Sequence, residues 1–173
     1  MLTSPKHIKL NSNAIERGYR SCRGAGRRYF KSQLWASINL PRDQRRALDA
    51  VLFNLMRTID LLDLESGDGR PLDVWFELRD DLSDAFRGKC TSVELAALVD
   101  ASRRFNIPKQ FIFDPLRGAD LWIRSQRFES FAALESFCSH IGGSSLVSAM
   151  PILGVIKPDF EVLAIECGKA IML

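Results

Sequence analysis

The chain has 173 residues, of which 46% are hydrophobic and 26% are charged, a composition typical of one soluble globular domain spanning residues 1–173. Its formal net charge of +3 comes from 24 basic and 21 acidic side chains, a balance too even to indicate a nucleic-acid partner. Four scattered cysteines without a CxxC pair and an N-terminus without an apolar signal-peptide core indicate a reducing, cytoplasmic location.

Apolar residues recur three and four positions apart between the Gly and Pro breakers, which predicts an all-α fold. Pro41 suits the first turn of one helix because its fixed φ matches helical backbone. Asn11, Ser12 and Asn13 can cap the first helix, Thr91 and Glu94 have the spacing of a capping box, and Ser130 can cap a later helix. The expected helices run from Asn13 to about Arg23, Arg42 to Asp63, Leu72 to Phe86, Thr91 to about Phe105, Pro108 onward, Ser130 to His140 and Asp159 to Leu173.

Two features of these helices bear on packing. The helix after Pro41 carries one apolar stripe, and Gly142 with Gly143 suggests a close contact between helices. The last helix has an apolar face for which the sequence offers no cover. The stripe consists of Leu48, Val51, Leu52, Leu55, Ile59 and Leu62.

Asp60 and Asp63 are the first candidate for chemistry. They lie three residues apart near the end of an amphipathic helix, so both carboxylates can project from one side. Magnesium is commonly held by one or two carboxylates, with phosphates and water filling its other positions. The pair is therefore a candidate site for binding a magnesium-bound diphosphate. The alternative is that both carboxylates belong to a solvated polar helix end, and the spacing alone favours this alternative.

Basic residues form a second candidate. A tract on the first helix offers cations to an anionic substrate or to a lipid surface, which would place the protein at the membrane periphery. Arg45 and Arg57 share a helix with Asp60, which allows a mixed site of cations and carboxylates. A solvated face explains the tract equally well. Its members are Arg17, Arg20, Arg23, Arg27, Arg28 and Lys31.

The order of residues from Tyr19 to the end of the chain resembles that of squalene/phytoene synthases. A Ser-containing segment reaches a Leu-Pro pair and leads through an arginine and spaced alanines into the helix of Asp60. Later landmarks follow in the family's order. The matching segments are Lys31 to Pro41 with Arg45, Ala47 and Ala50, then Asp73 to Leu78, Arg104 to Pro108, Leu116 to Gly118, Arg127-Phe128, Phe137-Cys138, Ile141 to Gly143, and Ala164 to Leu173.

This resemblance implies an isoprenoid-synthase-type helical bundle, incomplete at its C-terminus. It implies head-to-head condensation of prenyl diphosphates in squalene, hopanoid or carotenoid biosynthesis, with Mg²⁺ as cofactor and NADPH only for a squalene-type reductive step. In that family, metal and arginine stabilise the departing diphosphate while an apolar pocket protects the cation from water. The residues implied are Asp60 and Asp63 for metal and catalysis, Phe137 for catalysis, and Ser32, Arg45, Arg57 and Gly143 for substrate binding.

The sequence also departs from the family pattern. Ile59 stands where the first aspartate-rich motif begins, Phe137 replaces a tyrosine, and the second aspartate-rich motif falls beyond Leu173. One alternative is a non-catalytic relative that binds a prenyl lipid or a protein partner, as an assembly factor does. Another is a shortened form of a longer protein, for which self-association or a partner supplying the missing helices is expected.

Overall fold

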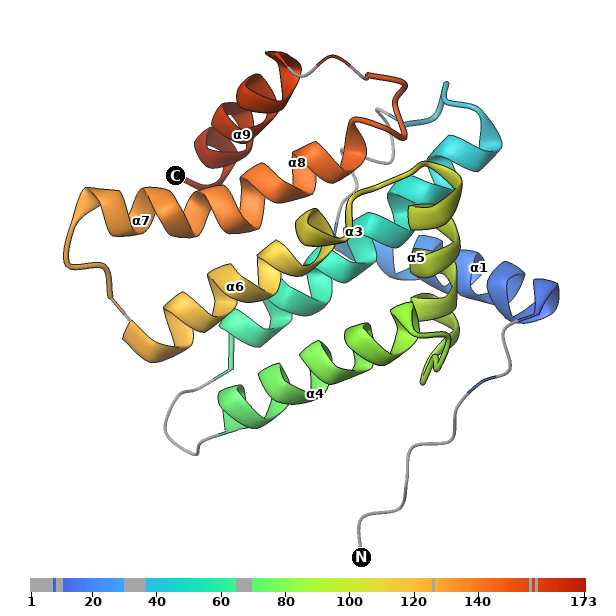
Figure 1. Ribbon diagram of the computed structural model, residues 1–173, viewed down its shortest axis with the longest axis horizontal. Helices are drawn as coiled ribbons and strands as arrows, with labels where there is room; N and C mark the ends of the chain where they lie inside the picture. Colours follow the sequence, from blue (N-terminus) through green and yellow to red (C-terminus); the bar gives the residue numbers. More distant parts are fainter. Residues whose placement is uncertain are drawn as a thin grey trace, which may run out of the picture.

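The computed structural model describes residues 8, 11–29, 37–64, 70–125, 127–155, 157 and 159–173 (Figure 1). Regular structure in these ranges is helical, apart from one isolated bridge in which the Ile8 amide donates to the Cys90 carbonyl at 2.7 Å. The predicted all-α fold is confirmed. The helices are α1 (Ser12–Tyr29), α3 (Arg42–Leu62), α4 (Arg70–Phe86), α5 (Val93–Arg104), α6 (Lys109–Ser125), α7 (Phe131–Cys138), η2 (Ser139–Gly143), α8 (Ser144–Ala149) and α9 (Asp159–Met172).

Side-chain caps fix where two of the helices begin. Asn11 Oδ1 accepts a hydrogen bond from the Ala14 amide at 2.8 Å, so α1 starts where the sequence predicts. Ser130 Oγ accepts from the Ala133 amide at 3.2 Å at the start of α7, as expected. Each cap satisfies an amide that the first helical turn leaves without a partner, a contribution of about 1 kcal/mol.

The predicted capping box at the start of α5 is wrong by one residue. Ser92, rather than Thr91, has the extended backbone of a cap (φ −135°, ψ 159°), and its side chain accepts from the Leu95 amide. The Thr91 hydroxyl instead donates to Asp81 at 2.9 Å. A tertiary hydrogen bond to α4 therefore replaces the local one that the spacing of Thr91 and Glu94 suggests.

Helix α3 runs through the middle of the molecule and touches α1, α4, α5, α6 and α8 (Figure 1). Ala47 and Ala50 are fully buried, and their small side chains let neighbouring helices approach the axis of α3. Leu82 of α4, Leu95 of α5 and Ile112 of α6 complete the same core. Burial of each such side chain stabilises the fold by about 1.5–3 kcal/mol, before the entropy cost of ordering the chain.

The helix predicted to end at His140 is longer in the structure. Helices α7 and α8 continue one another through η2, a single π-helical segment that contains the predicted Gly142-Gly143 contact point. A Cβ built on Gly142 would lie 2.1 Å from the carbonyl oxygen of Gly168. Because no side chain fits at that distance, the glycines permit the backbone contact between η2 and α9, and the prediction of a close helix contact is confirmed.

Helix α9 lies at the edge of the bundle against η2 and α8 (Figure 1). It leaves large apolar side chains exposed, with Val162 at 63% and Leu163 at 57% of their full accessible area. The expectation that this helix leaves apolar surface uncovered is confirmed. Exposed apolar area of this kind commonly marks a surface that contacts other protein or lipid.

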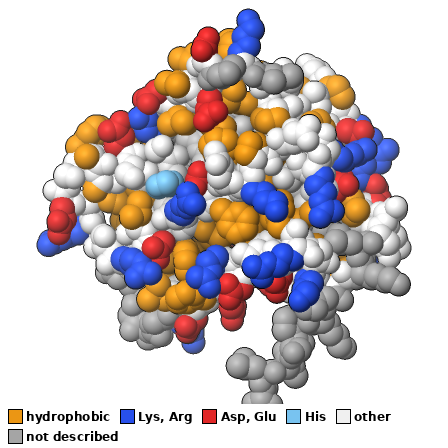
Figure 2. Space-filling view, in the orientation of Figure 1, with side chains coloured by type: hydrophobic (Ala, Val, Ile, Leu, Met, Phe, Trp, Pro, Cys, Tyr) orange, Lys and Arg blue, Asp and Glu red, His pale blue; other side chains and the backbone are white. Residues whose placement is uncertain are grey.

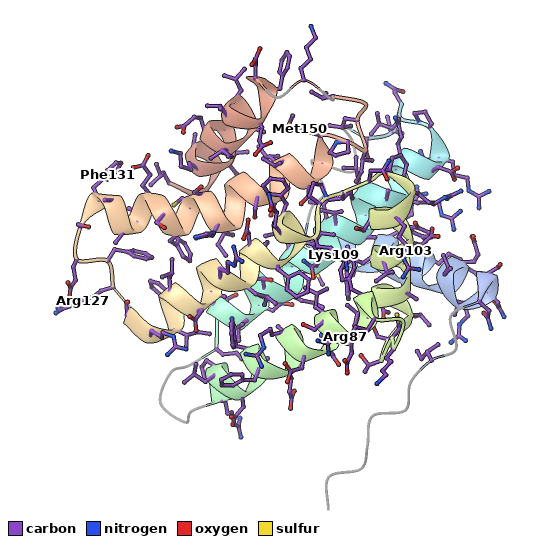
Figure 3. All side chains as sticks on the ribbon, in the orientation of Figure 1. Arg87, Arg103, Lys109, Arg127, Phe131 and Met150 are labelled. Atoms are coloured by element: carbon purple, nitrogen blue, oxygen red, sulfur yellow. The ribbon has the colours of Figure 1, made fainter. Side chains whose placement is uncertain are left out.

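The face formed by α4, α5 and α6 carries many Lys and Arg side chains mixed with Asp and Glu (Figure 2). Arg87, Arg103 and Lys109 extend from this face, from the end of α4, from α5 and from the start of α6 (Figure 3). The Lys109 ammonium lies 5.1 Å from the centre of the Phe86 ring, so the first residue of α6 contacts the last residue of α4. The cations of three helices therefore share one surface.

Candidate functional site

An apolar cavity of about 550 Å³ lies between α3 on one side and η2, α8 and α9 on the other. The predicted apolar stripe of α3 forms one wall, because Leu48, Leu52, Leu55 and Ile59 recur every three or four residues and share one helix face. The opposite wall comes from three helical segments and the turn that follows α8. That wall consists of Gly142, Ser145, Leu146, Ala149, Leu153, Gly168, Ile171 and Met172.

Asp60 and Asp63 lie exposed at the C-terminal end of α3, and neither lines this cavity. Ile59 does line it. Successive residues of a helix are rotated by about 100° about its axis. Asp60 therefore lies about 100° around α3 from Ile59, whereas Asp63, four residues after Ile59, lies near the same face of α3 as Ile59. Asp63 is the C-cap of α3, where its amide donates to the Leu61 carbonyl.

The two carboxylates interact with each other. Partial burial, and then the negative charge of Asp63, raise the pKa of Asp60 above its usual value. A bound cation would relieve this repulsion, because it favours the ionised form of both groups. Within the described ranges no three His, Cys, Asp or Glu side chains converge as a metal site, so the pair would act with ligands from outside the protein, such as phosphate and water.

The two predicted substrate-binding arginines turn away from the cavity. Arg57 forms an ion pair with Asp81 of α4, with 3.6 Å between Nη2 and Oδ2. Arg45 donates from Nη1 to the Ile38 carbonyl at 3.2 Å, while its buried Nε has no partner among the described residues. Ser32 lies outside the described residues. Both arginines therefore hold neighbouring segments in place, and neither lies among the cavity-lining residues.

The predicted tract of cations on the first helix is only partly described. Arg17 and Arg20 are exposed, whereas Arg23 is half-buried. The side chains of Arg27 and Arg28, and the whole of Lys31, lie outside the described residues.

Phe137 belongs to an aromatic cluster at the α6–α7 side of the cavity. Its ring centre lies 5.0 Å from that of Phe128 and 6.2 Å from that of Trp122. Leu55 and Met172 pack against this cluster and also line the cavity, so the cluster supports one end of the cavity from outside. Phe137 is buried and carries no group that could transfer a proton.

Gly143 plays a packing role beside Gly142. A Cβ on Gly143 would lie 3.2 Å from the Ile165 Cγ2 atom of α9, tighter than an ordinary contact between carbon atoms. Gly143 itself is absent from the residues that line the cavity, whereas Gly142 is present. The glycine that reaches the cavity is therefore the neighbour of the predicted one.

Sequence reasoning missed Asp49 as a cavity residue. Its side chain is 3% exposed and lines the cavity together with Ser37 and Ser145, the polar members of an otherwise apolar lining. Its negative charge contributes to raising the pKa of the buried Cys22 thiol, after burial itself and the charge of Glu94. The sequence signal that could have identified Asp49 is its position between Leu48 and the apolar pair Ala50 and Val51. An acidic residue in such a segment is expected to be buried, and buried acids are rare without a specific role.

Among the described helices, none is both long enough and apolar enough to cross a lipid bilayer.

Comparison with known proteins gives the family. Residues 27–173 match the family described as squalene/phytoene synthase. The chain is 27% identical over 154 residues to phytoene synthase 1 of Zea mays and 30% identical over 156 residues to phytoene synthase 2 of Solanum lycopersicum. Each alignment covers 87% of this chain, but only 37% and 47% of the respective relative.

Solved structures give the same fold. A dehydrosqualene synthase in complex with a ligand superposes with a TM-score of 0.80 at 23% identity, over 92% of this chain and 56% of that one. Squalene synthase HpnC from Alicyclobacillus acidocaldarius superposes with a TM-score of 0.76 at 20% identity, over 93% of this chain and 60% of that one. The predicted isoprenoid-synthase-type helical bundle is confirmed, and the partial coverage of both solved chains is consistent with the prediction of an incomplete bundle. The chain belongs to the squalene/phytoene synthase family.

Proposed function

We propose that the cavity between α3, α8 and α9 holds a prenyl chain whose diphosphate lies near Asp60 and Asp63, for head-to-head condensation of prenyl diphosphates. The observation that carries this proposal is the cavity itself. Its lining is apolar over most of its area, and its α3 wall leads to two carboxylates at the helix end. A pocket of this size, apolar with few polar groups, is typical of small-molecule sites.

The proposed site offers magnesium two carboxylate ligands from the described residues. Asp60 and Asp63 supply two carboxylate groups whose mutual repulsion favours cation binding, and Mg²⁺ commonly completes its coordination with phosphate and water. When bound, the metal would stabilise the negative charge of the departing diphosphate. The α3 residues would exclude water from the prenyl chain, while Arg45 and Arg57 would add positive potential nearby only after leaving their present partners.

The proposed enzyme would also need additional protein surface, and in one case NADPH. The chain spans 37% and 47% of the two curated relatives named above, and 56% of the dehydrosqualene synthase chain. The exposed apolar residues of α9 support association with additional helices or with a second copy. NADPH belongs to the proposal only if the product is reduced, as in a squalene-type reaction. A cytoplasmic location and peripheral membrane contact remain part of the proposal, and the exposed Arg17 and Arg20 of α1 support contact with an anionic lipid surface.

A second function is binding of a prenyl lipid, or of a protein partner, without turnover. Two observations favour it. Ile59 places an apolar side chain on the cavity wall where the family pattern has an aspartate, and Arg57 is paired with Asp81. With one carboxylate fewer, the site has less negative charge with which to bind magnesium and diphosphate.

The test is incubation of the purified chain with farnesyl or geranylgeranyl diphosphate and Mg²⁺, with and without NADPH, followed by chromatography of the extracted lipids. A head-to-head product supports the proposed enzyme. Saturable binding of farnesyl diphosphate without any product supports the second function. Absence of both product and binding would refute the proposed enzyme and the lipid-binding function, since each requires the cavity to accept a prenyl chain, and would leave binding of a protein partner as the second function.

A matched pair of variants locates the ligand. Leu52→Trp adds bulk to the α3 wall of the cavity, whereas Leu121→Trp adds the same bulk at an exposed position of α6. Binding should weaken in the first variant alone. Equal binding by both variants would show that the prenyl chain lies elsewhere.

A further inference from the structure

A second, much smaller cavity of about 10 Å³ lies behind the α3 wall, where α3, α6 and α8 meet. Its lining includes Asn54 of α3, Phe111 and Pro115 of α6, and Ser145 and Ser148 of α8. A cavity of about 10–15 Å³ is enough for a single water molecule, provided that two to four polar groups surround it. The polar groups of this lining therefore decide what the space can hold.

Ser148 supplies the first of them. Its side chain is 1% exposed, and its Oγ atom has no hydrogen-bond partner among the described residues. A buried hydroxyl without a partner loses its hydration and gains nothing in return, which is why such groups are nearly always satisfied by protein or by water. The hydroxyl of Ser148 thus offers a donor next to the small cavity.

The Phe111 carbonyl is the second polar group, because Pro115 removes the amide that would otherwise donate to it. Pro115 lies inside α6, and proline has no amide hydrogen to donate to the carbonyl four residues earlier, that of Phe111. Both residues line the small cavity. Water commonly occupies helix positions where a proline interrupts the hydrogen-bond ladder, because a freed carbonyl still needs a donor.

Asn54 supplies the third. Its Nδ2 donates to the carbonyl of Ile112 at 3.1 Å, beside the interrupted position, so its Oδ1 remains as an acceptor. The nearby Ser145 hydroxyl already donates to the Ile141 carbonyl at 2.6 Å. The polar groups of α3, α6 and α8 are thus complementary: one hydroxyl donor and two carbonyl acceptors.

We propose that this cavity binds one water molecule, which accepts from Ser148 Oγ and donates to the Phe111 carbonyl and to Asn54 Oδ1. Three hydrogen bonds are the usual number for a buried water. The site shares Val51, Leu55 and Ser145 with the large apolar cavity, so the water lies directly behind the wall of the proposed prenyl site. It satisfies the polar groups exposed by Pro115 without adding a polar atom to that wall.

The experiment is detection of long-lived water by nuclear Overhauser effects between water and protein protons in the 19.5 kDa wild-type chain. We expect cross-peaks to the Ser148 side chain and the Asn54 side-chain amide, with the sign of a water that tumbles with the protein. The wild-type spectrum is decisive without any variant. Lack of these cross-peaks would overturn the proposal.

Two variants test the assignment. Ser148→Val fills the cavity with methyl groups and removes the donor, so the cross-peaks should disappear. Ser144→Ala is the control, because it removes another buried hydroxyl of α8 that already donates to the His140 carbonyl and does not line the cavity. The cross-peak to the Asn54 side-chain amide carries the test, because the serine protons are themselves absent from Ser148→Val. Its persistence in Ser148→Val would refute the site, as would its loss in Ser144→Ala.

Discussion

Gly142 and Gly168 bring η2 and α9 into backbone contact, since a Cβ on Gly142 would lie 2.1 Å from the Gly168 carbonyl oxygen. We expect Gly142→Ala to lower the free energy of unfolding by about 1–3 kcal/mol, because α9 must move away to accept one methyl group. Urea denaturation followed by circular dichroism measures this change.

Gly24→Ala is the matched control for that substitution. Gly24 lies in α1, and a Cβ added there would meet no atom within 4 Å, so alanine should stabilise the protein by about 0.4–1 kcal/mol. The two glycine variants should therefore change stability in opposite directions. Equal effects would show that η2 and α9 are not in close contact in solution.

Ile59→Asp should place a carboxylate four residues before Asp63, on the wall of the large cavity. Without metal, the variant should lose about 1–3 kcal/mol of stability, because a charge replaces an apolar side chain beside two other carboxylates. Mg²⁺ at about 100 times its dissociation constant should return about 2.7 kcal/mol. Thermal unfolding with and without Mg²⁺ measures both effects.

Ile59→Asn provides the control for charge, because asparagine has nearly the size of aspartate and no negative charge. Its stability should not respond to Mg²⁺ beyond the response of the wild type. If Ile59→Asp responds no more than Ile59→Asn, the end of α3 is not a cation site.

Asp60→Asn should raise stability at neutral pH. The folded-state pKa of Asp60 is raised by burial and by Asp63, so the folded protein binds more protons than the unfolded chain in the window just above the ordinary pKa of 3.8. Wild-type stability therefore falls as pH rises through that window. Asp60→Asn has no carboxyl group to ionise at this position, so its stability does not fall in this way. Above this pH window it should be more stable than the wild type by roughly 0.2–0.5 kcal/mol, the range for like charges on one helix.

The measurement is the free energy of unfolding of both proteins at several pH values from acid to neutral. The difference should shrink toward acid pH, where Asp60 is protonated in both states of the wild type. A difference that stays constant with pH would assign the effect to the asparagine side chain itself and not to charge.

Leu52→Trp should weaken binding of a farnesyl ligand about tenfold, equivalent to about 1.4 kcal/mol, because the larger ring occupies part of the 550 Å³ cavity. Isothermal titration with a non-hydrolysable farnesyl diphosphate analogue measures the dissociation constant. Leu121→Trp should leave it unchanged. An unfolding midpoint close to that of the wild type would show that the loss comes from the cavity and not from misfolding.

Much of the fold follows from sequence pattern because helix periodicity and caps are local. The apolar stripe of α3 and the caps at Asn11 and Ser130 depend on residues within a few positions of one another. Thr91 does not cap α5 because its hydroxyl donates a hydrogen bond to Asp81, ten residues earlier. Such tertiary partners are invisible to spacing rules.

The candidate site was harder to predict than the fold. Spacing places Asp60 and Asp63 on one side of α3 and Ile59 in the apolar stripe, but it does not say that Ile59 lines a cavity whereas Leu62 of the same stripe does not. Likewise, Arg57 has the charge expected of a substrate ligand, yet its partner Asp81 lies on another helix. The rotation of a side chain about its helix and its distant partners require the packed structure.

The extra residue in η2 sets the rotational phase between α7 and α8. Each residue of an α-helix advances the face by about 100°, and a π-helical turn accommodates one residue more than an α-helical turn. Deleting a single residue from Ser139–Gly143 would therefore rotate every side chain of α8 by about a quarter of a circle relative to α7. Ser145 and Leu146 would then leave the cavity wall, so this one-residue insertion fixes which side of α8 a lipid would meet.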